Sequence, residues 1–175
     1  MSTHSEIILA GTGGQGLILS GMLLAEAAIL EGKNVVQTQS YGIASRGGLS
    51  LAEVIVDEDE IIFQQVRLPD CVLALTEEAA KKYESWAAKG VTLLYDSTLA
   101  AARVGPYFIG RDFTRRASDL GNAGSVNILA LATVAAFTRV VKIASLEQLL
   151  RKRFRGAALD LNLKLLAVGS ELAIA

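Results

Sequence analysis

The apolar and polar positions of the chain follow two patterns, which predict strands and helices in turn. Short apolar runs without alternation are typical of strands that are buried on both faces of a sheet. They predict strands at 6–10, 35–39, 49–56, 71–75 and 91–95, with short extended pieces at 61–63 and 107–109. Longer runs predict helices at 14–31, 77–89, 112–120, 125–141, 146–154 and 160–173.

Capping signals mark several of these helix ends. Gly32 and Gly90 follow predicted helices, and glycine readily adopts the left-handed conformation that ends a helix. Thr76 precedes two glutamates and predicts an N-cap. Ser145 and Gln148 have the spacing of a capping box, which predicts the start of the helix at 146–154.

The order of the elements predicts the fold class. The first strand, helix and second strand predict a parallel unit with a right-handed crossover. Further strands and helices then alternate before three helices end the chain. We therefore predict an α/β fold, a three-layer α/β/α sandwich with a Rossmann-like, mostly parallel sheet and a helical C-terminal third. A chain of 175 residues without a visible linker or repeat predicts one domain over 1–175.

Composition and charge limit the partners and the compartment that we expect for this chain. Apolar residues make up 51% of the chain and mean hydropathy is +0.40, which indicates either buried subunit contacts or a membrane. The longest apolar stretches are shorter than the roughly 20 residues that span a bilayer, so we expect subunit contacts and no membrane. A net charge of −1 does not recruit nucleic acid. With one cysteine and no visible signal peptide, we expect a cytoplasmic protein.

A glycine loop links the first strand to the first helix. It reads Gly11-Thr12-Gly13-Gly14-Gln15-Gly16 and fits the pattern G-x-G-x-x-G. Glycines permit a tight turn and a close ligand, and the following helix presents unpaired N–H groups to an anion. Gln15 either donates its amide to that ligand or caps the loop. A dinucleotide site would also need an acid about 20 residues later, and none occurs between Glu31 and Glu53, so an anion other than NAD is predicted.

A second loop rich in small residues follows the second strand. In a doubly wound sheet both loops emerge at the same carboxyl edge, where ligands bind. Arg46 can fork to a phosphate or carboxylate, Gly47 leaves its N–H accessible, and Ser40 adds a hydroxyl. The alternative is a surface arginine on a flexible turn. Asn127, one turn into a later helix, is expected to face the glycine loops.

The remaining polar features have simpler explanations. The acidic run at 57–60 is typical of a solvated turn, because adjacent carboxylates point apart. The basic run at 151–155 is typical of a solvated helix end. His4 lies in the N-terminal tail without a visible partner, and Cys71 is expected to be a core thiol. No Cys–His pair, Ser–His pair or metal-ligand cluster is visible, so we expect no catalytic or metal-binding residues and interpret the chain as a subunit.

The motifs, taken in order, resemble the gamma subunit of 2-oxoacid:ferredoxin oxidoreductases. They are Gly11 to Gly16, Gln39-Ser40-Tyr41-Gly42, Arg46-Gly47-Gly48, Pro69-Asp70, and Gly121-Asn122 with Asn127. The resemblance covers essentially the whole chain, and the ordered set is far more specific than any one motif. It identifies 1–175 as a gamma-type domain, with the 2-oxoglutarate enzyme first and the pyruvate, 2-oxoisovalerate and indolepyruvate enzymes close behind.

The resemblance implies a complex that decarboxylates a 2-oxoacid, reduces ferredoxin and transfers the acyl group to coenzyme A. Thiamine diphosphate, magnesium and iron–sulfur clusters are then expected on the alpha, beta and delta partners, so this chain is inactive alone. The isolated chain could form a homodimer. The residues implied in contacts with coenzyme A, or with a partner subunit, are Gly11, Gly13, Gly14, Gln15, Gly16, Ser40, Tyr41, Arg46, Gly47 and Asn127.

Two alternatives stay open at the level of sequence. One is a stand-alone NADP-binding reductase in which Ser40 and Arg46 hold the 2′-phosphate in place of the missing acid. It lacks a catalytic set, and the chain leaves little room for a substrate domain. The other is a scaffold subunit, in which substitutions in both loops would affect assembly only.

Overall fold

The computed structural model describes residues 4–41 and 48–173. Within them a six-stranded sheet forms in the order β2-β3-β1-β4-β5-β6. The strands are β1 (Ser5–Thr12), β2 (Asn34–Tyr41), β3 (Leu49–Asp57), β4 (Cys71–Ala74), β5 (Thr92–Asp96) and β6 (Phe108–Arg111). The sheet is therefore mixed, with β1, β4, β5 and β6 parallel and β3 antiparallel to both of its neighbours.

The position of β3 corrects the predicted strand–helix–strand unit. Strands β1 and β2 run in the same direction, as predicted, but β3 lies between them instead of the two being neighbours. The physical reason is that β3 follows β2 after a short connection, and consecutive strands so joined pair antiparallel. Five of the six strands still share one direction, which agrees with a mostly parallel sheet.

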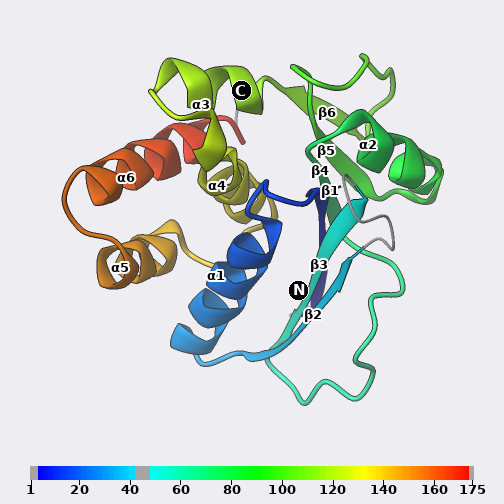
Figure 1. The fold of residues 1–175 in the computed structure, drawn as a ribbon. Helices are drawn as coiled ribbons and strands as arrows, with labels where there is room; N and C mark the ends of the chain where they lie inside the picture. The colour runs from blue at the N-terminus through cyan, green and yellow to red at the C-terminus, as the bar shows by residue number, and fades with distance from the viewer. Residues whose placement is uncertain (1–3, 42–47, 174–175) are drawn as a thin grey trace.

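Helices cover both faces of the sheet, as the three-layer prediction requires (Figure 1). They are α1 (Leu17–Leu30), α2 (Glu77–Tyr83), η1 (Glu84–Lys89), α3 (Phe113–Asp119), η2 (Ala123–Ser125), α4 (Val126–Thr138), α5 (Ile143–Arg153) and α6 (Gly156–Glu171). The larger core forms between the sheet and α1 and α4, with α5 and α6 packed on those helices. The smaller core lies on the other face, under α2 and η1.

Strand β1 contributes to both cores by alternation. Ile7 and Leu9 point into the larger core, whereas Ile8 and Ala10 point into the smaller one. All four are at most 2% exposed. An unbroken apolar run is therefore required here, because successive side chains of a strand point to opposite faces.

Several helix boundaries differ from the predicted ones. Helix α1 begins at Leu17 because Gly16 adopts a left-handed φ of 72°. Helix α4 ends at Thr138 because Arg139 is left-handed, with a φ of 57°. Helix α6 begins at Gly156, four residues before the predicted start, and the helix predicted over 77–89 continues as a 3₁₀ helix after Tyr83. The extended piece predicted at 61–63 is not a strand.

Other capping predictions are confirmed. The N–H of Gly32 donates to the Ile29 carbonyl at 3.0 Å, and the N–H of Lys33 donates to the Ala28 carbonyl at 3.0 Å, which is a Schellman end. The Thr76 hydroxyl accepts from the backbone N–H of Ala79 at 3.2 Å. In the described part of the chain, no helix is long and apolar enough to cross a membrane.

Helix α5 shows that the predicted capping box is wrong. The helix starts at Ile143, which places Ser145 inside its first turn. The Ser145 hydroxyl instead donates to the carboxylate of Glu31 at 2.7 Å, and the Lys142 N–H donates to the same oxygen at 2.6 Å. A carboxylate from the end of α1 therefore caps the start of α5. Burial alone would raise the pKa of Glu31, but these hydrogen bonds and Lys33 lower it overall.

Candidate functional site

The glycine loop connects β1 to α1 and is braced by Gln15. The backbone N–H of Thr12 donates to Gln15 Oε1 at 2.8 Å, and Gln15 Nε2 donates to the carbonyl of Leu75 at 3.2 Å. Leu75 directly follows β4, so the side chain ties the loop to the neighbouring strand. Of the two roles considered for Gln15, the geometry favours capping of the loop.

Gly11 and Gly16 are required by the packing of the loop itself. A Cβ on Gly11 would overlap Gln15 Oε1, the acceptor in the brace. Gly16 has a φ of 72°, and a Cβ there would lie 2.5 Å from Asn127 Nδ2. Any larger residue at either position would therefore distort the turn.

Gly13 and Gly14 form the outer side of the same loop. Both are exposed, and no described atom lies within 4 Å of a Cβ added to either. Gly14 needs to be glycine for its φ of 89°, whereas the φ of Gly13 is not in the left-handed region. The described chain therefore leaves the space above Gly13 open.

Asn127, the second residue of α4, joins that helix to the glycine loop, which confirms that it faces the first of the two loops. The Asn127 Nδ2 donates to the Gly16 carbonyl at 3.2 Å, and the backbone carbonyl of Asn127 accepts from the Ser20 hydroxyl at 3.4 Å. The residue is 6% exposed. The N-termini of α1 and α4 thus meet at one place, where two positive helix ends favour an anion.

The end of β2 lies at the same edge of the sheet as the glycine loop. Tyr41 and Gly11 are both aligned with Ser50 of the intervening β3. Two strand spacings, about 10 Å, therefore separate the two strand ends. Ser40 is exposed beside this edge. Arg46 and Gly47 lie outside the described residues.

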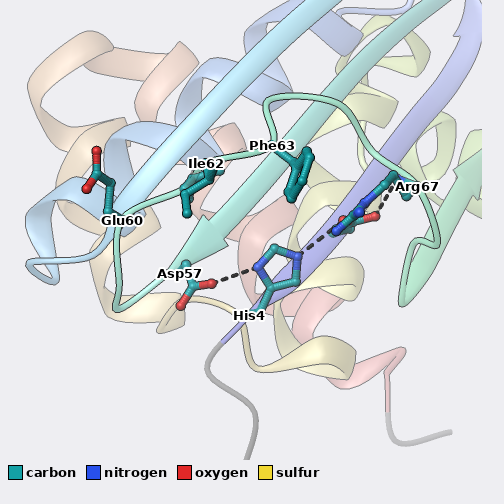
Figure 2. Close-up of a pocket in the computed structure, with 8 residues that line it drawn as sticks. His4, Asp57, Glu60, Ile62, Phe63 and Arg67 are labelled. Carbon is teal, nitrogen blue, oxygen red and sulfur yellow. Dashed lines mark hydrogen bonds and ion pairs between the residues drawn. The ribbon is translucent and has the colours of Figure 1, made fainter.

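A separate cluster of charged side chains surrounds His4, which lies where β1 begins, at the far end of this strand from the glycine loop (Figure 2). The imidazole lies 2.7 Å from Asp57 Oδ2 through Nδ1 and 3.2 Å from Glu6 Oε1 through Nε2. The expectation that His4 has no partner is therefore wrong. Hydrogen bonds to Glu6 and then Asp57 raise the pKa of His4. Asp57 is distant in sequence, and only the pairing of β1 with β3 brings it near.

Glu6 holds this cluster to the connection between β3 and β4. Its Oε2 accepts the backbone N–H of Arg67 at 2.7 Å and that of Leu68 at 2.9 Å. Burial would raise the pKa of Glu6, but these N–H groups and His4 lower it overall. A cavity of about 190 Å³ lies beside the cluster, and Phe63 stacks under the Arg67 guanidinium at 4.3 Å.

The other predicted polar groups have structural roles. Cys71 is fully buried, and burial raises its pKa to about 12, so it is a core thiol. The Arg155 guanidinium donates to three carbonyls at the end of α5, which agrees with a helix-end role for the basic run. Across the described residues, no group of three or more His, Cys, Asp and Glu is placed to hold a metal ion.

Comparison with known proteins identifies the family. A model described as "Pyruvate ferredoxin/flavodoxin oxidoreductase" matches residues 6–172. The chain is 40% identical to "2-oxoglutarate synthase subunit KorC" of Archaeoglobus fulgidus, over 98% of this chain and 89% of that one. The KorC protein of Methanocaldococcus jannaschii is 36% identical, over 97% and 94%. The chain therefore belongs to the pyruvate ferredoxin/flavodoxin oxidoreductase family.

Solved structures agree with this assignment. The keto/oxoacid ferredoxin oxidoreductase gamma subunit of Geobacter sulfurreducens matches with a TM-score of 0.84 at 39% identity, over 97% of this chain and 98% of that one. The 2-oxoglutarate:ferredoxin oxidoreductase of Magnetococcus marinus, solved with 2-oxoglutarate, coenzyme A and succinyl-CoA, shares the fold, with a TM-score of 0.86 at 22% identity. Our chain spans 31% of that longer chain. The resemblance to gamma subunits that the glycine motifs predict is thus confirmed.

Proposed function

We propose that the chain is the gamma subunit of a cytoplasmic 2-oxoglutarate:ferredoxin oxidoreductase that contains alpha, beta and delta partners. Its homology to KorC subunits over nearly the whole chain supports this proposal. Such a complex converts 2-oxoglutarate and coenzyme A to succinyl-CoA and carbon dioxide, while two electrons pass to ferredoxin. Thiamine diphosphate, magnesium and iron–sulfur clusters would reside on the partners, and this chain would bind and orient a ligand.

We assign coenzyme A as that ligand because the outer side of the glycine loop is open. Gly13 and Gly14 are exposed beside the start of α1, and the start of α4 meets the loop at Gly16. Backbone N–H groups and two helix ends suit the phosphates of coenzyme A. Ser40 and Tyr41, at the same sheet edge, and Arg46 and Gly47 beyond them would complete the site.

The test replaces Arg46 with alanine in the reconstituted four-subunit complex. Loss of a charge-assisted hydrogen bond costs about 1.5–3 kcal/mol, so the KM for coenzyme A should rise roughly 10- to 150-fold. The KM for 2-oxoglutarate and the assembly of the complex should stay unchanged. Arg67→Ala is the matched control, because it removes an arginine that lies near the start of β1, away from the glycine loop.

Other outcomes would separate the competing roles. An unchanged KM for coenzyme A in Arg46→Ala would reject the ligand assignment, and loss of assembly alone would indicate a scaffold subunit. Saturable binding of NADPH by the purified chain would instead favour the reductase. The substrate is tested by dye reduction with 2-oxoglutarate, pyruvate, 2-oxoisovalerate and indolepyruvate, where 2-oxoglutarate should give the highest kcat/KM and require coenzyme A.

A further inference from the structure

Strand β2 leaves one edge of the sheet open. Among the described elements, only β3 pairs with it. Its eight residues, Asn34–Tyr41, include no charged residue and no proline. Edge strands are usually short, charged or covered, because their outward N–H and C=O groups can pair with another strand. Among the described residues, β2 is neither short nor charged, and of its side chains only Asn34, at its start, is hydrogen-bonded to the connection after β3, at the carbonyls of Glu58 and Asp59.

The opposite edge of the sheet is built differently. Strand β6 has only four residues and ends at Arg111. The Arg111 guanidinium donates to the carbonyl of Leu172 at 2.8 Å, which places the residue that follows α6 beside the end of that strand. A short strand that ends in a charged residue is protected from further pairing. The contrast singles out β2 as the edge available for association.

Helix α1 presents an apolar seam on the same side of the molecule. The seam consists of Ile18, Met22, Ala25 and Ile29, whose spacing of four, three and four residues is that of a helix-packing stripe. Met22 is 39% exposed and Ile29 is 60% exposed. Gly21, the neighbour of Ile18 and Ala25 on the helix surface, faces Gln37 of β2. The seam therefore flanks the open strand.

No unpaired charge interrupts this surface on the described chain. Glu26 is the charged residue next to the seam, and its carboxylate pairs with Arg153 of α5 at 2.9 Å, on the other side of α1. The amide nitrogen of Gln37, between β2 and α1, is buried and has no hydrogen-bond partner among the described residues. Gln37 occupies the middle of β2, where a symmetric pairing would bring its copy closest.

We propose that the β2 edge and the α1 seam bind a second copy of this chain around a two-fold axis. Antiparallel pairing of β2 with its copy would join the two sheets, with each uncharged side chain opposed by another from the same strand. Helix α1 lies over β2 and β3 (Figure 1). With strands about 4.8 Å apart, the two α1 axes would then lie roughly 10–14 Å apart, so the seams meet.

The small size of this surface indicates a weak, reversible dimer. Eight strand residues span about 26 Å, and a sheet with one helix layer is about 20 Å deep. The dimer would therefore bury roughly 1,000 Å² in total, at the lower limit of specific interfaces. We expect a reversible dimer with a Kd in the micromolar range, on the order of 10 µM.

Sedimentation of the purified full-length chain between about 1 and 200 µM tests this proposal. The wild type should change from monomer to dimer, and Ile29→Lys and Met22→Lys should each raise the Kd at least tenfold, because a lysine would be buried against its copy. Val104→Lys is the matched control, since Val104 is 96% exposed on the loop before β6. Circular dichroism establishes that each variant is folded.

Hydrogen exchange locates the interface independently. Peptides from Asn34–Tyr41 should exchange more slowly at high than at low concentration of the wild type, and not in Ile29→Lys. A wild type that stays monomeric throughout, a dimer unaffected by both lysines, or a dimer with unprotected β2 amides would each overturn the proposal. If the wild type is monomeric and the lysines impair only assembly with alpha, beta and delta subunits, the edge belongs to a partner subunit.

Discussion

Single residues in the glycine loop have different reasons for being glycine. Gly16 has a left-handed φ and contacts Asn127 so closely that a Cβ has no room. Gly13 has neither constraint within the described chain. The same residue type therefore serves the internal packing at one position and leaves an open surface at the other.

This difference predicts the stability of two alanine variants. Gly16→Ala should lower the free energy of unfolding by roughly 2–4 kcal/mol, from left-handed strain and overlap with Asn127. Gly13→Ala should change it by less than about 0.5 kcal/mol. Urea denaturation of the two purified variants measures both. Equal losses would show that the loop does not distinguish the positions in this way.

The titration of His4 gives a second prediction at this scale. His4 is the only histidine of the chain, so its NMR titration can be followed without overlap. Glu6 and Asp57 should place the midpoint above 6.5. Asp57→Asn should lower it, and Glu58→Gln, on the adjacent turn, should not. Because the folded pKa is raised, the stabilisation is present below pH 6.5 and is lost as pH rises through the folded value. A wild-type midpoint at or below 6.5 would contradict the pairing.

Elements depend on contacts that lie outside their own sequence. The start of α5 is set by Glu31 at the end of α1, which accepts hydrogen bonds from Lys142 and Ser145. A local capping box predicted the existence of this helix but not its first residue. Its partner is more than a hundred residues away in sequence, beyond the reach of any local pattern.

Replacement of Glu31 tests this cap. Glu31→Gln should lower the free energy of unfolding by about 1–2 kcal/mol at pH 7, the usual effect of losing a helix cap. The folded pKa of Glu31 is lowered from 4.5, so the stabilisation is present above that value and is lost as pH falls through the folded pKa. Denaturation from pH 7 to about 3 should therefore show the gap between wild type and variant closing. Glu58→Gln is the control, and a pH-independent gap would argue against a charged cap.

The whole molecule consists of two cores that share one sheet. The larger core lies under α1 and α4, and the smaller one lies under α2 and η1. Because neighbouring residues of β1 belong to different cores, neither core can form without the strands that build the other.

We therefore predict a single unfolding transition. Trp86, the only tryptophan of the chain, packs against the smaller core, whereas most helical residues lie on the other face. Its fluorescence and far-ultraviolet circular dichroism should give the same midpoint in urea, within about 0.2 M. An earlier fluorescence transition would show that the α2 and η1 layer unfolds separately.

The sequence by itself determined the fold class, most of the elements and the family. Apolar runs specify buried strands, glycines specify helix ends, and the glycine motifs are local patterns that a chain displays before it folds. The sequence could also predict that Gly11 and Gly16 lie in a tight turn and that Asn127 lies beside this turn. A strand, a loop and a helix start are each recognisable from local sequence.

Only the tertiary structure decided the contacts between residues that are far apart in the sequence. The insertion of β3 between β1 and β2, the capping of α5 by Glu31 and the pairing of His4 with Asp57 each join segments well apart in the chain. It also distinguished Gln15, which braces the loop, from Gly13, which leaves it open. Local patterns fix backbone conformation, but the partner of a side chain is fixed by packing, because it depends on which elements the fold brings together.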